Sequence, residues 1–360
     1  MAKIGLLVYP AKAGLHSRIA MKVVTFGEIM LRLSPPGSER LLQSPTLSAT
    51  FGGAEANVAV SLAHWGFESV YVSRVPPHAL GDAAIRALRA EGVQTAAILR
   101  GGDRLGIYFA ENGAGQRSSS VVYDRTHSAI SEIEPGAIDW SQVLDGAAWF
   151  HVSGVTAALG AGPANAVAAA LAVARGAGIR TSLDLNYRRK LWSESQAQAT
   201  LRPVMKNVNV VFANEEDLQT SLGFHVSGVD VRTGRVDPAA YRDVIASVCE
   251  LGPELVAITL RESISASDNG WTAVLGGTPL NELLQGPRYD VRIIDRIGAG
   301  DSFAAGMIYA LLTGREPLDA LRFAVAAGAL KHTVPGDFNR VSVEEVDRLA
   351  AGDGSGRVQR

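Results

Sequence analysis

Short apolar runs of strand length recur along this chain, and several precede a segment with helix-start residues and helical apolar spacing. Strands that alternate with helices are typical of a mostly parallel sheet covered by helices on both faces. In such α/β folds, ligands bind beyond the carboxyl ends of the strands. The expected strands are residues 22–26, 69–74, 147–152, 180–185, 207–213, 254–260 and 289–294.

Two stretches break this alternation and predict a small additional β-sheet. Residues from about 29–51 and 105–125 carry period-two or mixed patterns with turn residues between them. The chain has no internal repeat of fixed period and no long Pro/Gly-rich linker. We therefore expect one large domain, residues 21–346, that carries the small sheet as a lid.

The two ends of the chain differ in composition from this expected domain. A clean strand pattern begins only at Met21, so residues 1–20 are interpreted as a leader, from an upstream start or an added segment. Residues 347–360 contain the linker-like run Gly-Asp-Gly-Ser-Gly, and we expect a flexible tail there.

Composition and charge exclude several classes of protein. Of the 360 residues 47% are apolar, enough for a large core, and the formal net charge of −2 lacks the basic excess typical of nucleic-acid binding. Any anionic ligand therefore needs a local site. A single cysteine, Cys249, excludes an intrachain disulfide and a Cys-based zinc cluster. No apolar run has the length of a signal peptide or membrane span, so we expect a cytoplasmic protein without membrane or nucleic-acid partners.

The densest motif is Asp-Arg-Ile-Gly-Ala-Gly-Asp at residues 295–301, between an expected strand and an expected helix. The small residues Gly298, Ala299 and Gly300 allow successive backbone N–H groups to turn toward one point. The helix N-terminus adds partial positive charge there. The motif therefore predicts an anion site.

Asp301 closes this motif and is the candidate general base. At a helix start we expect it to be ionised, and beside an anion site it could remove a proton from an attacking hydroxyl. An equally consistent interpretation is an Asp that only caps the helix after a glycine turn. Other phosphate motifs are absent: no Gly-Lys pair forms a P-loop, and Phe303 stands where a dinucleotide fingerprint needs Gly or Ala.

A second motif is the diglycine turn at residues 52–57, which enters a helix. Gly53 can bring backbone close to a hydroxylated ligand, and Asn57 offers both a donor and an acceptor. The alternative is a loop-to-helix junction with a solvated Asn.

A third set of residues could bind a carboxylate. Arg188 lies just past a strand end, and Tyr123 and Arg125 share one face of an extended segment. Arginine binds carboxylates through two parallel hydrogen bonds, and a Tyr hydroxyl adds a neutral donor. The alternative for each arginine is a surface charge.

In this order, the motifs resemble those of the ribokinase-like carbohydrate kinases, also called the PfkB family. The family signature Asp-Thr-x-Gly-Ala-Gly-Asp corresponds to residues 295–301, and its Gly-Gly-x-x-x-Asn motif to residues 52–57. The resemblance covers about residues 21–346 and is strongest to kinases of 2-keto-3-deoxygluconate. That narrower likeness rests on Gly27-Glu28, Tyr108, Tyr123, Arg125, the segment 184–188, Leu191-Trp192 and Pro335-Gly336-Asp337.

The resemblance implies a ribokinase-like fold and a role for each motif. Asp301 would deprotonate the primary hydroxyl of the sugar for attack on the γ-phosphate of ATP, while residues 298–300 hold the transferring phosphoryl group. Gly53 and Asn57 would bind sugar hydroxyls. The implied substrate pocket also contains Tyr108, the carboxylate-binding residues Tyr123, Arg125 and Arg188, and Asp337.

The same resemblance implies a nucleotide site that contains Asn186, Asn214 and Thr259. Asn186 and Asn214 would lie near the phosphates and their Mg²⁺, although no residue is assigned as a direct metal ligand. The lid would also form the interface of a homo-oligomer.

The chain departs from the family pattern at three places. Arg296 stands where the family usually has Thr, and Asp217 ends the usual Asn-x-x-Glu motif. The usual nucleotide loop Thr-x-Gly-x-x-Gly reads Thr-Leu-Arg-Glu-Ser-Ile from Thr259, so two glycines that let backbone approach phosphate are missing.

The leading hypothesis is ATP-dependent phosphorylation of 2-keto-3-deoxygluconate (2-dehydro-3-deoxygluconate) to its 6-phosphate. One alternative is a fructokinase-like or other sugar kinase of the same family. Another is a non-catalytic sugar-acid sensor that retained the fold. The residues leave the gluco and galacto epimers undistinguished.

Overall fold

A computed structural model describes residues 20–225 and 240–354, and its core is one large sheet. The strands in spatial order are β13 (Leu284–Gln285), β12 (Asp268–Gly277), β11 (Leu255–Ser263), β10 (Val210–Asn214), β9 (Arg180–Asp184), β8 (Ala147–Ser153), β1 (Lys22–Phe26), β4 (Glu68–Val75) and β5 (Ile98–Arg100), with β14 (Tyr289–Arg292) beside β12. Neighbouring strands are parallel from β5 to β11, whereas β12 runs antiparallel to β11, β13 and β14.

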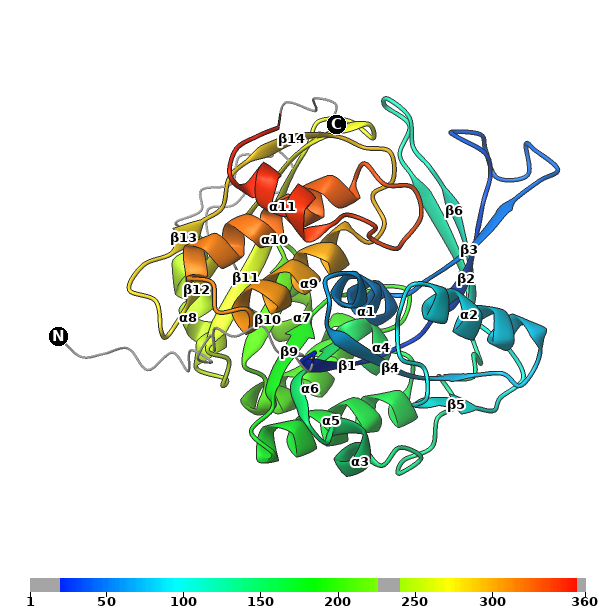
Figure 1. The fold of residues 1–360 in the computed structure, drawn as a ribbon, viewed down its shortest axis with the longest axis horizontal. Helices are drawn as coiled ribbons and strands as arrows, with labels where there is room; N and C mark the ends of the chain where they lie inside the picture. Colours follow the sequence, from blue (N-terminus) through cyan, green and yellow to red (C-terminus); the bar gives the residue numbers. More distant parts are fainter. Residues whose placement is uncertain (1–19, 226–239, 355–360) are drawn as a thin grey trace.

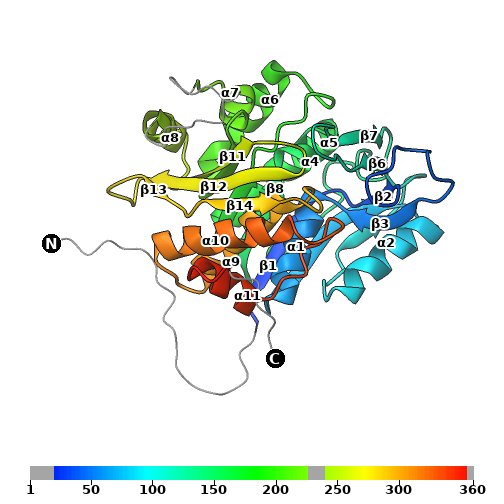
Figure 2. The ribbon, with the colours of Figure 1, turned by 90° about the horizontal axis from the view of Figure 1, so that it is seen from above.

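Helices cover both faces of the sheet, which Figure 2 shows nearly edge-on. Each helix layer packs on the sheet through its own buried apolar cluster. One layer contains α1 (Ala54–His64), α2 (Ala79–Ala90), α9 (Ala299–Leu312), α10 (Pro317–Lys331) and α11 (Val343–Ala350). The other contains α3 (Trp140–Leu144), α4 (Gly154–Ala157), α5 (Ala161–Gly176), α6 (Glu194–Leu201), the 3₁₀ helix Arg202–Asn207, α7 (Asp217–Leu222) and α8 (Tyr241–Cys249). The predicted α/β class, a mostly parallel sheet between helix layers, is confirmed.

A second sheet lies at one side of the molecule (Figure 1), as predicted from residues 29–51 and 105–125. Its strands are β3 (Ser48–Gly52), β2 (Met30–Ser34), β6 (Ile107–Glu111) and β7 (Ser120–Asp124), in that order. The turn between β6 and β7 contacts the turn between β11 and β12, where the Ala266 N–H donates to the Gly115 carbonyl over 2.7 Å. The second sheet is thereby joined to the large one.

The strand β11 is longer than the sequence analysis predicts. The expected strand ends at residue 260 and a loop is expected to follow. Instead, β11 continues to Ser263 and pairs antiparallel with β12, with Arg261 opposite Trp271 and Ser263 opposite Asn269. The missing glycines explain the difference, since residues with side chains continue a strand more readily than glycine does.

The described part of the chain reaches beyond the expected start of the tail. Helix α11 ends at Ala350, and Arg315 binds Asp347 on it over 2.5 Å. The expected leader lies almost wholly outside the described residues, as does the end of the expected tail, from residue 355. Among the residues that are described, no helix is long and apolar enough to cross a membrane.

Candidate active site

The 295–301 motif forms a turn into α9, and geometry requires a glycine at only one of its two glycine positions. Gly298, the N-cap, has φ of +87°, and a Cβ there would lie 2.3 Å from the Asp337 carbonyl oxygen. A Cβ on Gly300 would meet no atom within 4 Å apart from its chain neighbours and the nearby helix backbone. The N–H groups of the first turn have no intrahelical acceptor. The turn therefore leaves open space beside unpaired donors, as an anion site requires.

Asp301 lies in the first turn of α9 and does not cap it, so the simpler interpretation of Asp301 as an N-cap is wrong. Its Oδ2 accepts a hydrogen bond of 2.7 Å from the Asn57 side-chain amide. Burial raises the pKa of Asp301 to about 7, although the Asn57 hydrogen bond and the Arg188 charge oppose the rise. The expectation of a fully ionised Asp301 is therefore corrected to a group that titrates near neutrality, because burial disfavours its charged form.

The diglycine turn packs closely against the backbone of Glu28 and the side chain of Asp337. A Cβ on Gly53 would lie 1.9 Å from the Glu28 carbonyl oxygen, and one on Gly52 would lie 2.0 Å from Oδ2 of Asp337. Asn57 is 3% exposed, so the alternative of a solvated Asn is wrong. Both motifs converge because α1 packs against α9, which brings Asn57 to Asp301.

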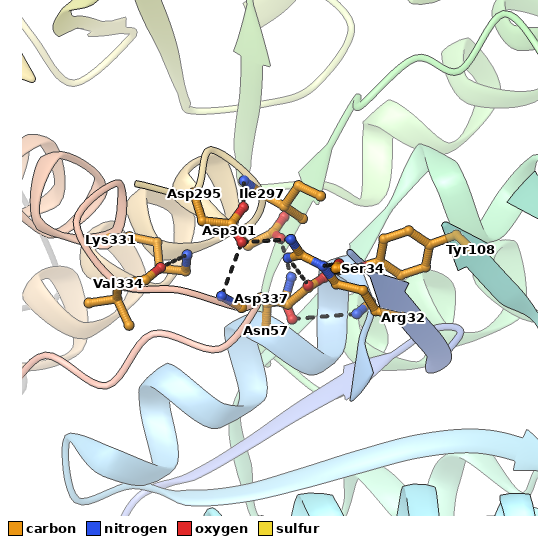
Figure 3. A network of polar contacts seen from close by, with 12 residues as sticks. Arg32, Ser34, Asn57, Tyr108, Asp295, Ile297, Asp301, Lys331, Val334 and Asp337 are labelled. Atoms are coloured by element: carbon orange, nitrogen blue, oxygen red, sulfur yellow. Dashed lines mark hydrogen bonds and ion pairs between the residues drawn. The ribbon is translucent and has the colours of Figure 1, made fainter. Parts of the chain in front are cut away.

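A buried ionic network joins the second sheet to this site (Figure 3). Arg32 on β2 donates to Asp295 over 2.7 Å and to Asp337 over 2.9 Å, and the Tyr108 hydroxyl donates to Asp337 over 2.5 Å. Asp295 also accepts from the Gly336 N–H. The carboxylates are thus satisfied by protein groups, and burial raises the pKa of Asp337 although Arg32 opposes it. Arg32 was not predicted as a site residue, because nothing in its local sequence sets it apart from a surface arginine.

The proposed carboxylate-binding residues lie in two different environments. Arg125 is 7% exposed, so it is not a surface charge; its Nη2 donates to Glu28, and its guanidinium lies 5.4 Å from the centre of the Tyr123 ring. Arg188 is exposed and, within the described residues, its side chain makes no hydrogen bond or ion pair. Arg188 is therefore the cation of this set that is free to receive a ligand.

Asn186 and Asn214 lie at or just beyond the carboxyl ends of β9 and β10, and Thr259 lies within β11, where it pairs with Asn214. Asn186 donates to Asp184 over 3.3 Å, and Thr259 donates to the Ala213 carbonyl. The Asn214 Oδ1 accepts the Asp217 N–H, so this oxygen caps the local turn.

Two buried carboxylates accompany these residues. Asp217 accepts the backbone N–H groups of Tyr187 and Asn214 over 3.0 and 3.1 Å. Burial raises the pKa of Asp184 and of Asp217, and the nearby carboxylates add to the rise for Asp184. Within residues 20–225 and 240–354, no group of three or more His, Cys, Asp or Glu side chains is placed to hold a metal ion directly.

One cleft of about 330 Å³ is lined by every predicted site residue except Ala299, which is buried. It opens at the carboxyl ends of the strands, where the fold class predicts a ligand site. Other residues that line the cleft were not predicted as site residues from the sequence. Among them are Met30, Asp184 and Trp271, together with Asp217, Arg261 and Arg296, which stood out only as departures from a family pattern.

Comparison with known proteins agrees with this geometry. The chain matches the pfkB family carbohydrate kinases over residues 20–342. It therefore belongs to this family and is a sugar kinase with the ribokinase-like fold. A solved structure of 2-dehydro-3-deoxygluconokinase from Thermotoga maritima is 48% identical, covers 92% of this chain and all of the other, and superposes with a TM-score of 0.88.

Two further relatives differ in their named activity. The 2-dehydro-3-deoxygalactonokinase of Haloferax volcanii is 31% identical over 335 residues, which is 93% of this chain and 98% of the relative. A putative ribokinase II from E. coli, solved in complex with ATP and Mg²⁺, has the same fold at 21% identity, with a TM-score of 0.76 over 92% of this chain and 99% of the other.

Proposed function

We propose that this sugar kinase transfers the γ-phosphoryl group of ATP to the 6-hydroxyl of 2-keto-3-deoxygluconate, giving the 6-phosphate and ADP. The observation that carries the proposal is the position of Asp301. Its carboxylate faces the cleft beside the open first turn of α9 and has a pKa near 7, which suits a general base at neutral pH.

In this mechanism Asp301 accepts the proton of the sugar hydroxyl as the hydroxyl oxygen attacks the γ-phosphorus. The new P–O bond forms while the bond to the β,γ-bridging oxygen breaks, and ADP leaves. The N–H groups beside Gly298, Ala299 and Gly300 stabilise the charge of the transferring group. Asn57 fixes the direction of the Asp301 carboxylate through its hydrogen bond.

The proposed sugar site contains two kinds of contact. Gly53 and Asn57 bind hydroxyls, with Tyr108 and Asp337 at the wall that Arg32 holds in place. Tyr123, Arg125 and Arg188 receive the carboxylate, and Arg188 offers a guanidinium that no hydrogen bond or ion pair holds within the described residues.

ATP and Mg²⁺ fit the remaining part of the cleft. Asn186, Asn214 and Thr259 line it together with Asp184 and Asp217. These acceptor oxygens suit a hydrated Mg²⁺, which keeps most of its waters and takes few direct protein ligands. When bound, the ion would neutralise charge on the phosphates. The shorter Asp217 is held by two backbone N–H groups, so its carboxylate is fixed in direction.

Two further proposals concern the role of the second sheet, and the bounds and cellular location of the kinase domain. We propose that the second sheet acts as the lid and as the interface of a homo-oligomer, because it lies at one side of the molecule and its Val122 side chain is 49% exposed on β7. We also propose that residues 21–346 form the kinase domain and that it works in the cytoplasm.

A substrate panel with an assay of ADP release tests the proposed function. We expect the fastest turnover with 2-keto-3-deoxygluconate and lower rates with fructose and ribose; its galacto epimer belongs in the same panel because one relative carries that name. Turnover of neutral sugars with none on either acid would favour the fructokinase-like alternative. Binding of the acid without ADP release, in wild type and Asp301→Asn alike, would favour the sensor.

A further inference from the structure

Two arginines line the cleft at positions where the family pattern has none. Arg261 replaces the first glycine of the nucleotide loop, and Arg296 replaces the threonine of the anion motif. They come from separate segments, one on β11 and one between β14 and α9. The loss of two loop glycines thus coincides with the gain of two guanidinium groups in the same cleft.

The exposed guanidinium of Arg261 is not held by a carboxylate, although the charge of the nearby Glu215 attracts it. It lies 5.9 Å from the centre of the ring of Trp271, its pairing partner on β12, and Trp271 is 1% exposed. The nearby Glu215 carboxylate accepts the backbone N–H of Arg261 over 2.5 Å. Within the described residues, no ion pair engages the Arg261 side chain.

Arg296 is half-buried and only partly satisfied. Its Nη2 donates to the Ala266 carbonyl over 3.0 Å, and its Nε is buried without a partner among the described residues. Ala266 lies in the turn that Gly115 fixes, so this acceptor holds the guanidinium in place. Burial lowers the pKa of Arg296, and the charge of Arg261 lowers it further.

The other charged groups nearby compensate these two arginines only in part. Asp295 attracts Arg296 but is paired with Arg32. Burial lowers the pKa of His332 to about 4, so His332 is neutral at pH 7, and Lys331 donates to the Val334 carbonyl. Two cations that raise each other's energy in one cleft are stabilised by an anion placed between them.

We propose that Arg261 and Arg296 bind the phosphate oxygens of the nucleotide, in place of the backbone contacts that the missing glycines would give. Guanidinium groups suit this task because each presents paired N–H donors to phosphate. The inference rests on the proposed function for the identity of the nucleotide. It predicts that affinity depends on the phosphate chain, with adenosine bound weakly by comparison.

Calorimetric binding to the full chain, without turnover, tests this role. The probes are ATP, inorganic tripolyphosphate and adenosine, each with wild type, Arg261→Ala and Arg296→Ala. We expect each variant to bind ATP and tripolyphosphate about tenfold to a hundredfold more weakly, with adenosine affinity unchanged. Arg261→Lys and Arg296→Lys, which keep the charge without the planar fork, should recover part of the loss. The exposed Arg292 on β14 does not line the cleft, and Arg292→Ala is the matched control.

The proposal fails if ATP and tripolyphosphate bind both alanine variants as tightly as wild type, or if wild type binds neither probe. It also fails if the variants lose affinity for the sugar acid while ATP affinity stays unchanged, since the arginines would then serve the carboxylate. If Arg296→Ala does not fold, Arg296→Lys and the exposed Arg261 still decide the question. A chain that phosphorylates a different sugar would overturn the proposed substrate and leave this test intact.

Discussion

The side-chain amide of Asn57 donates a hydrogen bond of 2.7 Å to Oδ2 of Asp301, across 244 residues of sequence. This contact joins the diglycine motif to the anion motif. It also limits the rise in the pKa of Asp301 that burial causes. The candidate base is therefore oriented before any ligand binds, which is a requirement for efficient proton transfer.

Replacement of the base should separate binding from catalysis. Asp301→Asn keeps the size of the side chain but cannot accept a proton, so we expect kcat to fall by about 10²- to 10⁴-fold with sugar affinity largely retained. ADP release gives kcat, and calorimetry gives the affinity. A variant that keeps more than about half of wild-type kcat would remove Asp301 from the mechanism.

The rate should also depend on pH. Because burial raises the pKa of Asp301 from 3.8 to about 7, the base is protonated in acid. We expect kcat/KM to increase with pH up to about 7 and to level off above it, because kcat/KM reports the free enzyme. A profile that stays flat between about pH 5.5 and 8.5 would contradict the assignment.

The same pKa has a consequence for stability. The unfolded chain releases the Asp301 proton near pH 4 and the folded protein only near pH 7, so stability falls as pH rises through this window. Asp301→Asn removes the buried charge, and we expect the free energy of unfolding at pH 8 to increase by up to about 4 kcal/mol. Urea unfolding should show no such gain near pH 4.

Arg188→Ala should weaken the acid substrate selectively. Arg188 is exposed and its side chain makes no hydrogen bond or ion pair within the described residues, so its loss should raise KM for the keto-deoxy acid about tenfold to a hundredfold. KM for ATP and the unfolding midpoint should stay close to wild type. The neighbouring Arg189, also exposed but outside the cleft, gives the control variant Arg189→Ala. Equal effects of the two variants would show that Arg188 acts only through general surface charge.

Arg32→Ala should destabilise the protein. Without the guanidinium, Asp295 and Asp337 remain buried with an uncompensated charge, and such losses typically cost about 3–5 kcal/mol. Urea unfolding measures the effect. Arg40→Ala is the matched control on the same segment, because Arg40 is exposed and its pair with Glu111 is long, at 3.4 Å.

Much of this fold follows from patterns that are local in the sequence. The parallel strands and the turn at Gly298 could be predicted, because an apolar run and a glycine with positive φ are features of a few neighbouring residues. The extension of β11 to Ser263 was not predicted, because its partner β12 was not recognised as a strand. The pairing of Arg125 with Glu28 was also missed, since it depends on which segments the fold brings together.

Asp301 shows why the protonation state of a carboxylate could not be predicted from the local sequence. A helix start predicts an ionised carboxylate, and only the packed structure shows that burial is the larger effect. Arg32 shows the same limit for packing, since no spacing rule marks its two partners, 263 and 305 residues away.

The position of Arg32 also restricts how this protein can be recombined. Its strand belongs to the small sheet, yet its guanidinium pairs with the buried carboxylates of Asp295 and Asp337 beside the 295–301 turn. A chimaera that took residues 29–51 from a relative without this arginine would leave two carboxylates unmatched in the body of the enzyme. The small sheet therefore cannot be exchanged on its own, and an exchange of its strands between relatives must keep Arg32, Asp295 and Asp337 together.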